Sequence, residues 1–293
     1  MNDVLLTLPF TDWTPAVGPQ LAAQATAALE RGGILFLPQL AFETAPEERR
    51  LIDPRWLDGK AKNISYDARN SEIRHTSAAD GDRAALAALL ARFSRQARTL
   101  LLALCPHYSA ALEWGLTSFR PAAVEGRPSS DKKDDSRLHI DAFASRPNQG
   151  RRILRMFCNL NPRGEPRAWN VGEPFEDMAR RFRDRVPPQW PGSAQLLAAF
   201  GITRGRRSAY DHIMLNLHDR AKLDFEYQRS SPRQGIEFPA GSTWIVYTDR
   251  VMHAALRGQF MLEQTFYLPV AAMQEERYAP LRVLEQLWQR PLA

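Results

Sequence analysis

Helical periodicity dominates the first third of the chain. Residues 18–31 place apolar side chains three and four positions apart, and Gly32 and Gly33 follow as a typical helix stop. The run ILFLP (34–38) then predicts a short buried strand. The longest amphipathic segment is 82–104. Its apolar stripe consists of Leu86, Leu90, Phe93, Ala97 and Leu101.

Strand signals dominate the remainder of the chain, where Pro, Gly, Asp and Arg clusters separate apolar runs. The predicted strands are TSFRPAAVEG (117–126), RLHIDAF (137–143), RRILRMFCNLN (151–161), SAYDHIMLNLH (208–218), GSTWIVYTD (241–249) and QFMLEQTFYLP (259–269). Two helical pieces interrupt them, PFEDMARRFRDRV (174–186) and GSAQLLAAFG (192–201). Many short strands after a helical segment favour an antiparallel jelly roll braced by helices.

We therefore expect one mostly-β domain over residues 1–293. Residues 1–115 would form a helical part that braces the barrel, 116–270 the jelly-roll core, and 271–293 a C-terminal helix with Leu281, Leu284, Leu287 and Trp288 at helical spacing. That helix could lie on a membrane surface, or pack on its own domain or on another subunit.

The bulk composition supports a folded protein with a basic surface. Hydrophobic residues make up 44% of the 293 residues, which argues against disorder of the whole chain. A net charge of +6 favours anionic partners. Two cysteines predict buried free thiols, and the absence of a signal-like or membrane-spanning run predicts a cytoplasmic protein without a transmembrane segment.

A candidate metal site begins with His139 and Asp141 in RLHIDAF. Residues two apart on a strand point to the same face, so an imidazole and a carboxylate would emerge together. His253 follows the strand at 241–249 and can supply a third ligand. Two histidines and one carboxylate form the facial triad of non-haem iron(II) oxygenases. We therefore predict that these three residues are the iron ligands and the catalytic centre.

The other histidines are rivals or bystanders. His212 and His218 flank IMLNL at a spacing of six, which would put them on one face of the predicted strand and make them alternatives to His253. They could equally be hydrogen-bonded pocket walls. His75 lies in a polar stretch, and His107 follows a helix end.

An iron oxygenase of this type also needs donors for the distal carboxylate of 2-oxoglutarate. Such enzymes often carry an Arg on the strand after the distal His, and FMLEQTFYLP has none. The candidate donors are Arg155, Asn159, Arg257 and Gln264. Arg155 could instead be an exposed charge on an edge strand.

The chain resembles the Kdo hydroxylases, which act on 3-deoxy-D-manno-oct-2-ulosonic acid in the lipopolysaccharide inner core of Gram-negative bacteria. The segments that carry the resemblance are KNISYD (62–67), residues 117–169, NVGEPFE (170–176), AYDHIMLNLHD (209–219), residues 238–270 and PLRVLEQL (280–287). The resemblance implies a double-stranded β-helix (jelly-roll, cupin-like) fold that uses Fe(II), 2-oxoglutarate and O2. It carries the metal role onto His139, Asp141 and His253.

The activity implied by the resemblance is hydroxylation of Kdo at C3, which gives D-glycero-D-talo-oct-2-ulosonic acid. The partner would be Kdo-lipid A or another lipopolysaccharide precursor, with possible peripheral contact with the cytoplasmic face of the inner membrane. A basic run from Arg120 to Arg137 precedes the iron ligands, and arginine suits carboxylates and phosphates. From this run and the loop after the 151–161 strand, we predict substrate contacts by Arg127, Lys133 and Arg167.

Two other functions remain open from the residues. A nucleic-acid oxygenase could use the same iron site and a basic surface, but we see no base-flipping or DNA-binding module and expect no nucleic-acid partner. A non-oxidative metal-binding jelly roll, such as a sugar isomerase or a lipopolysaccharide-binding module, could hold zinc with the same ligands.

Overall fold

Two β-sheets and seven helices form the described part of the chain. The computed structural model describes residues 4–126 and 130–293. The strands are β1 (Leu5–Thr7), β2 (Ile34–Leu37), β3 (Ile64–Asp67), β4 (Glu72–Arg74), β5 (Glu113–Arg120), β6 (Arg152–Asn159), β7 (Arg167–Val171), β8 (Gln234–Phe238), β9 (Thr243–Tyr247), β10 (His253–Arg257) and β11 (Met261–Leu268). The helices are α1 (Pro19–Glu30), α2 (Asp80–Leu104), α3 (Phe175–Phe182), α4 (Ser193–Ala199), α5 (Ala209–Leu223), α6 (Phe225–Ser230) and α7 (Pro280–Trp288).

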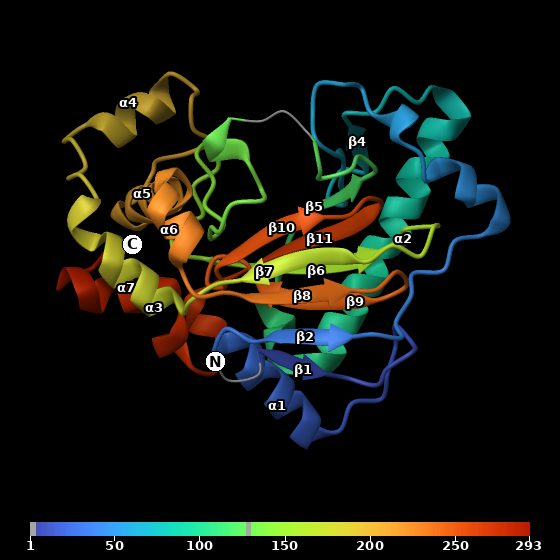
Figure 1. Ribbon diagram of the computed structural model, residues 1–293, viewed down its shortest axis with the longest axis horizontal. Helices are drawn as coiled ribbons and strands as arrows, with labels where there is room; N and C mark the ends of the chain where they lie inside the picture. Colours follow the sequence, from blue (N-terminus) through green and yellow to red (C-terminus); the bar gives the residue numbers. More distant parts are fainter. Residues whose placement is uncertain (1–3, 127–129) are drawn as a thin grey trace.

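The two sheets build the predicted jelly-roll core. The large sheet has the strand order β1-β2-β9-β6-β11-β5-β3-β4, and the small one the order β10-β7-β8. Every neighbouring pair is antiparallel except β1 with β2. Figure 1 shows α3 to α7 gathered at one end of the sheets and α2 running alongside the large one.

Strand β6 shows how the side chains of the large sheet divide. Leu154, Met156 and Cys158 pack into the hydrophobic cluster that contains the buried face of α2. Phe157 points the other way, into a second cluster between the sheets. Successive strand residues alternate between faces, so Arg155 shares the inner face with Phe157. The inner cluster is aromatic, and Phe238 stacks on Trp244 with ring centroids 4.1 Å apart.

The predicted helices are confirmed. The segments expected at 18–31, 82–104, 174–186 and 192–201 are α1, α2, α3 and α4. All five residues of the predicted stripe on 82–104 are buried. Residues 1–115 brace the sheet with these first two helices and also contribute β1 to β4 to it.

The strand predicted at 208–218 is wrong, because the segment forms α5. Ser208 caps the helix by accepting a hydrogen bond from the backbone N–H of Asp211, whose carboxylate accepts from the Ser208 backbone in return. The buried residues Ile213, Met214 and Leu217 are then three and four apart, as a helix requires. The short apolar run IMLNL is compatible with a strand or a helix, and the capping hydrogen bonds of Ser208 favour the helix.

The C-terminal helix α7 packs on the molecule itself. Leu281 and Leu284 are buried in the main hydrophobic cluster, and Leu287 and Trp288 are partly buried against it. The apolar stripe that could have faced a membrane is therefore occupied by the protein core. None of the described helices has the length and hydrophobicity needed to cross a bilayer.

Candidate metal centre and its pocket

The candidate metal ligands come from two backbone segments held together. His139 and His253 exchange backbone hydrogen bonds, with N–O distances of 3.0 and 2.8 Å. The backbone N–H of Asp141 donates to the carbonyl of Thr248 at 2.7 Å. The predicted strand at 137–143 is reduced to this isolated bridge at His139. The bridge still sets the ligand segment beside the start of β10.

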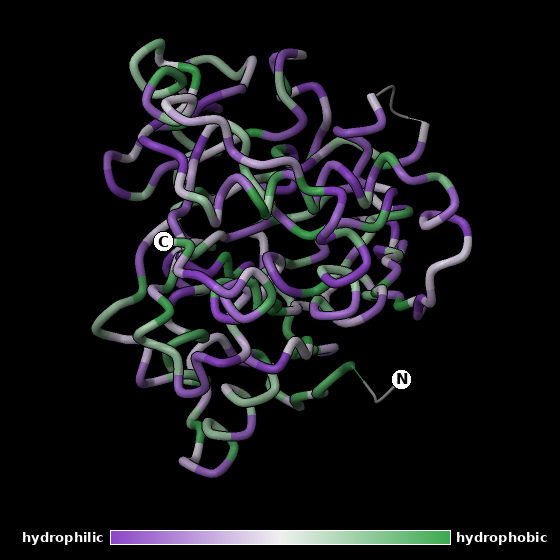
Figure 2. Tube along the Cα trace, turned by 90° about the vertical axis from the view of Figure 1, so that its left-hand side faces the viewer, coloured by the Kyte–Doolittle hydropathy of each residue, from purple (hydrophilic) through white to green (hydrophobic). Residues whose placement is uncertain are grey.

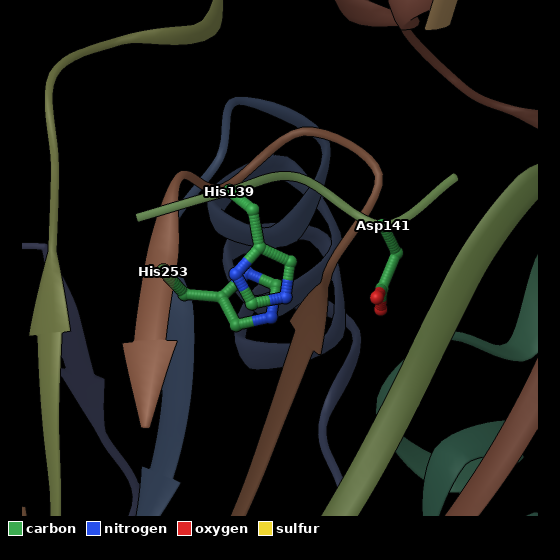
Figure 3. A group of neighbouring side chains, drawn as sticks. All are labelled: His139, Asp141 and His253. Atoms are coloured by element: carbon green, nitrogen blue, oxygen red, sulfur yellow. The ribbon is translucent and has the colours of Figure 1, made fainter. Parts of the chain in front are cut away.

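The three side chains point toward one another. One ligand atom from each of His139, Asp141 and His253 can be chosen so that all lie within 4.8 Å of one another. Figure 3 shows the two imidazoles side by side and the Asp141 carboxylate projecting toward the same space. Within the described residues, this is the single group of three or more His, Cys, Asp or Glu side chains close enough to hold a metal ion.

Backbone carbonyls fix which imidazole nitrogen is free. Nδ1 of His139 lies 2.7 Å from the carbonyl oxygen of Arg137, and Nδ1 of His253 lies 2.8 Å from that of Val251. A carbonyl can only accept, so both Nδ1 atoms carry the proton and both Nε2 atoms keep a lone pair for a metal. Burial lowers the pKa of both histidines, and His253 lowers that of His139 further. Neutral imidazoles are the form that ligates.

The carboxylate of Asp141 is kept in its ligating form by Arg155. Burial by itself raises the pKa of a carboxyl group. Here the Nη1 atom of Arg155 lies 3.1 Å from Oδ2 of Asp141. This charge, with smaller contributions from the surrounding groups, outweighs burial, and the pKa of Asp141 is lowered.

A cavity of about 200 Å³ opens in front of these ligands, between the two sheets. Its walls include Phe157 from the large sheet and Trp169 from the small one. Trp169 stacks on the His253 ring with centroids 5.1 Å apart, so it holds the imidazole in place as well as lining the cavity. Larger cavities of about 560 and 670 Å³ lie elsewhere and contain none of the three ligands.

Two of the cavity's arginines already have carboxylate partners. Arg120 Nη2 lies 2.6 Å from Glu263 Oε2. Arg155 lies near Asp141, as above, and its Nη1 atom is also 3.5 Å from Glu263 Oε1. Glu263 and Asp141 thus neutralise most of the charge that these two arginines bring into the site.

Arg167 is the cavity arginine that stands apart. Its guanidinium donates to the carbonyl of Gly258 at 3.0 Å, and the described residues offer it no ion pair. The side chain is buried, and burial together with the charge of Arg120 lowers its pKa to about 9. The carboxylates of Asp135, Glu125 and Glu263 oppose this shift from a distance, but none of them pairs directly with Arg167. A buried cation without a direct ion pair favours the binding of an anion.

The comparison with known proteins decides the family. The model of the 3-deoxy-D-manno-oct-2-ulosonic acid (Kdo) hydroxylase family matches residues 12–291. The chain belongs to the Kdo hydroxylase family. No curated protein sequence matches it.

Solved structures of a Kdo hydroxylase have the same fold. KdoO, a non-haem Fe(II) α-ketoglutarate-dependent dioxygenase in complex with α-ketoglutarate and Fe(III), is 43% identical, with a TM-score of 0.96 over 99% of this chain and 97% of that one. KdoO in complex with cobalt(II) is 44% identical, with the same TM-score over 98% and 97% of the two chains. The jelly-roll prediction and the family resemblance are both confirmed.

Three residues predicted to bind 2-oxoglutarate lie away from the pocket of this Kdo hydroxylase family member. Gln264 faces α2, where its Oε1 accepts hydrogen bonds from Ser94 and Thr117. The side chain of Asn159 donates to the carbonyls of Glu165 and Phe238 and holds a turn.

Arg257 lies outside the pocket as well. More than half of its side chain is exposed, and it pairs with Glu237 at the surface. Of the four predicted anchors, Arg155 is therefore the one that lines the cavity. The sequence of β11 alone does not show whether Gln264 points toward α2 or into the cavity.

The predicted substrate residues divide in three ways. Arg127 lies outside the described residues. Lys133 is exposed, and its carbonyl accepts a hydrogen bond from the Lys62 ammonium near the cavity. Arg167 is not an exposed loop residue as expected but a buried wall of the metal pocket, because β7 begins at this residue and turns it inward.

The rival histidines occupy different positions from those predicted. On the helix α5, a spacing of six residues puts His212 and His218 on different sides. His212 is bonded to the carbonyl of Pro187 near the surface. His218 packs against His139 with ring centroids 5.6 Å apart, but its Nδ1 lies 3.0 Å from Asp219. His218 therefore packs against a candidate ligand without belonging to the cluster.

Sequence reasoning missed Trp169 and Arg120 as pocket residues. The strand RAWNV was not predicted. Its buried and half-buried residues alternate as in a strand, but the pattern includes Arg167 as a buried residue, and an arginine is normally expected at the surface. Arg120 appeared only as one charge of a basic run. Its pairing with Glu263 depends on the register of β5 with β11, which places Ser118 opposite Glu263 and brings Arg120 close by.

Proposed function

We propose that this protein hydroxylates Kdo, using Fe(II), 2-oxoglutarate and O2. The observation that carries the proposal is the cluster of two Nε2-presenting histidines and one ionised aspartate, with ligand atoms within 4.8 Å and a cavity in front of them. Two imidazoles and a carboxylate on one face are the donor set of non-haem iron(II) oxygenases. We also propose that residues 1–293 act as one oxygenase domain.

In this proposal His139, Asp141 and His253 hold the iron. The bound iron would activate O2 with 2-oxoglutarate, which becomes succinate and CO2 as one oxygen atom enters the sugar. The residues of the chain prepare the site for this reaction. The carbonyls of Arg137 and Val251 hold the imidazole protons on Nδ1, and Arg155 keeps Asp141 ionised. Phe157 and Trp169 give the cavity apolar walls, which favour the exclusion of water during the reaction.

The finer assignment is to the lipopolysaccharide inner core. We propose hydroxylation at C3 of Kdo in Kdo-lipid A, which gives D-glycero-D-talo-oct-2-ulosonic acid. The test is to incubate the protein with Kdo-lipid A, Fe(II), ascorbate and 2-oxoglutarate under air. We expect the lipid to gain the mass of one oxygen atom together with stoichiometric succinate. Succinate formation without any gain of oxygen by the lipid would assign the chemistry but reject this substrate.

We propose Arg167, rather than Arg155, as the anchor of the distal 2-oxoglutarate carboxylate. Arg155 already forms ion pairs with Asp141 and Glu263, whereas Arg167 is buried without an ion pair in the described residues. An Arg–carboxylate pair in a dry pocket is a strong hydrogen-bonding arrangement. The anchor would then come from β7, beside the β10 strand that begins with His253.

Replacing Arg167 with alanine should raise the KM for 2-oxoglutarate and leave Fe(II) affinity nearly unchanged. Loss of one charged hydrogen-bond partner costs about 1.5–3 kcal/mol, or roughly 10- to 150-fold. Arg155→Ala should show the reverse pattern, because Arg155 acts on the ligand Asp141. Arg257→Ala, an exposed arginine on β10, is the matched control and should behave as wild type. An unchanged KM in Arg167→Ala would return the anchor role to Arg155.

A further inference from the structure

A hydrophobic surface surrounds α4 in the segment 187–207, which we call the α4 segment. Four of its large apolar side chains are exposed, with exposed fractions of 79% for Trp190, 59% for Leu196, 77% for Phe200 and 58% for Ile202. Only three other large hydrophobic residues in the described chain reach 36% exposure. Scattered exposed apolar residues are ordinary, but four large ones within residues 190–202 are typical of an interaction surface.

The backbone of the α4 segment turns its large apolar side chains outward. Leu196 and Phe200 are four apart, and the N–H of Phe200 donates to the carbonyl of Leu196 at 2.9 Å. Residues at this spacing lie on one side of a helix. Ala194 and Thr203 face inward instead, and the Thr203 hydroxyl donates to the carbonyl of Gly205. In this segment the small or hydrogen-bonded side chains therefore face the protein, and the large apolar side chains face the solvent.

The charge on the same segment is entirely positive. Between Asp184 and Asp211 the sequence contains no acidic residue. The basic residues Arg204, Arg206 and Arg207 follow directly after the exposed apolar residues. None of these three arginines has an ion pair among the described residues. An apolar surface edged with unpaired arginines complements an anionic lipid surface.

The α4 segment is tied to the loop that follows the metal ligand Asp141. The backbone N–H of Arg204 donates to the carbonyl of Ser145 at 2.8 Å, and Nη2 of Arg207 donates to the carbonyl of Ala144 at 2.7 Å. In Figure 1 α4 lies at the outer edge of the molecule, at the end where α3 to α7 gather. Figure 2 views the molecule from that side and shows hydrophobic (green) stretches at its upper edge.

We propose that the α4 segment is a membrane-docking surface that inserts Trp190, Leu196 and Phe200 into the interfacial region of an anionic bilayer. Arg204, Arg206 and Arg207 then contact lipid phosphates. The proposal rests on the proposed function in one respect, because a lipid-linked sugar is presented at such a surface. Tryptophan suits this position, since its ring prefers the boundary between headgroups and acyl chains.

The test measures binding of the full-length protein to vesicles, without catalysis. We use sucrose-loaded vesicles of phosphatidylglycerol and phosphatidylethanolamine, and pure phosphatidylcholine vesicles for comparison. Wild type should sediment with the anionic vesicles, more weakly in added salt and more weakly with phosphatidylcholine. Trp190→Ser combined with Phe200→Ser should reduce the partition coefficient by about tenfold or more. Replacing the three arginines with glutamine should reduce it by roughly fivefold per charge and remove the salt dependence.

The matched control is Phe225→Ser. Phe225 has an exposed fraction of 66% but lies on α6, outside the α4 segment, so its loss should leave vesicle binding unchanged. All replaced side chains are exposed or half-buried, and the melting temperature of each variant reports that it is folded. Trp190 fluorescence adds a second readout, because brominated lipids should quench wild type more than the folded Trp190→Phe variant.

Three results would overturn the proposal. Wild type could ignore anionic vesicles, or the folded Trp190 and Phe200 double variant could bind them as wild type does. The third result is a wild-type dimer in solution that this double variant converts to a monomer while vesicle binding is unchanged, which would assign the surface to a second copy of the chain. Hydroxylation of detergent-dispersed Kdo-lipid A is measured separately, so failure of the proposed function would leave the vesicle result standing.

Discussion

Replacing His253 with alanine is expected to abolish hydroxylation and lower Fe(II) affinity by more than 100-fold. Loss of an outer partner of a metal ligand alone costs about 10- to 100-fold in affinity or activity, and loss of the ligand itself should exceed that range. The backbone bonds between His253 and His139 do not involve the side chain, so the fold should persist. Anaerobic equilibrium dialysis against Fe(II) measures the affinity, and circular dichroism reports the fold.

The same result is expected for His139→Ala and Asp141→Ala. The matched control is His212→Ala, because His212 lies on α5 and bonds to the Pro187 carbonyl, away from the ligand cluster. His218→Ala should weaken activity less than the ligand variants, since His218 only packs against His139. The assignment of the third ligand fails if His253→Ala keeps its iron while His218→Ala loses it.

Replacing Asp249 with alanine should destabilise the protein by about 3–5 kcal/mol. Asp249 forms two hydrogen bonds with Arg152, at 2.8 and 3.1 Å, and both side chains are fully buried. Removing the carboxylate leaves a buried guanidinium without its counter-charge. For a chain of this size the melting temperature should fall on the order of 10 °C, which thermal unfolding followed by circular dichroism will measure.

Two further variants separate the loss of the pair from a general effect of substitution. Glu276→Gln breaks the surface pair with Arg282, whose side chains are about 40% exposed, and should cost less than about 1 kcal/mol. Adding Arg152→Met to Asp249→Ala should recover much of the lost stability, because the uncompensated charge is then gone. A double variant that is no more stable than Asp249→Ala would contradict this electrostatic explanation.

The sequence predicted the structure best where the spacing of a few residues determines which side chains lie on the same face. The stripe of 82–104 predicted the buried face of α2, and His139, Asp141 and His253 do lie together. The prediction of their grouping survived although 137–143 is mostly not a strand, because neighbouring ligands need only a short extended backbone. The strand predicted at 208–218 failed because a capping residue, Ser208, outweighed an ambiguous apolar run.

The residues of the proposed co-substrate pocket could not be predicted from the sequence, because sheet pairing brings them together. The sequence predicted Arg167 as one charge of a surface loop. In the structure it is the first residue of β7, and the pairing of β7 with β8 and β10 directs its side chain into the pocket. The roles of Arg155 and Arg167 also depend on which carboxylates reach them, and Glu263 is more than a hundred residues from Arg155 along the chain. Spacing predicts a side chain's face, but tertiary pairing decides its partners.

The reciprocal backbone bonds between His139 and His253 have a consequence for metal selectivity. They join two of the proposed ligands through main-chain bonds that need no metal ion. Divalent ions compete for such nitrogen and oxygen donors in the Irving–Williams order, in which Fe(II) ranks below Co(II), Ni(II) and Cu(II). On the proposed assignment, iron occupancy is therefore set by the concentrations of the competing free ions around the folded protein. Protein produced in nickel- or cobalt-rich medium should carry the wrong metal while keeping its native structure.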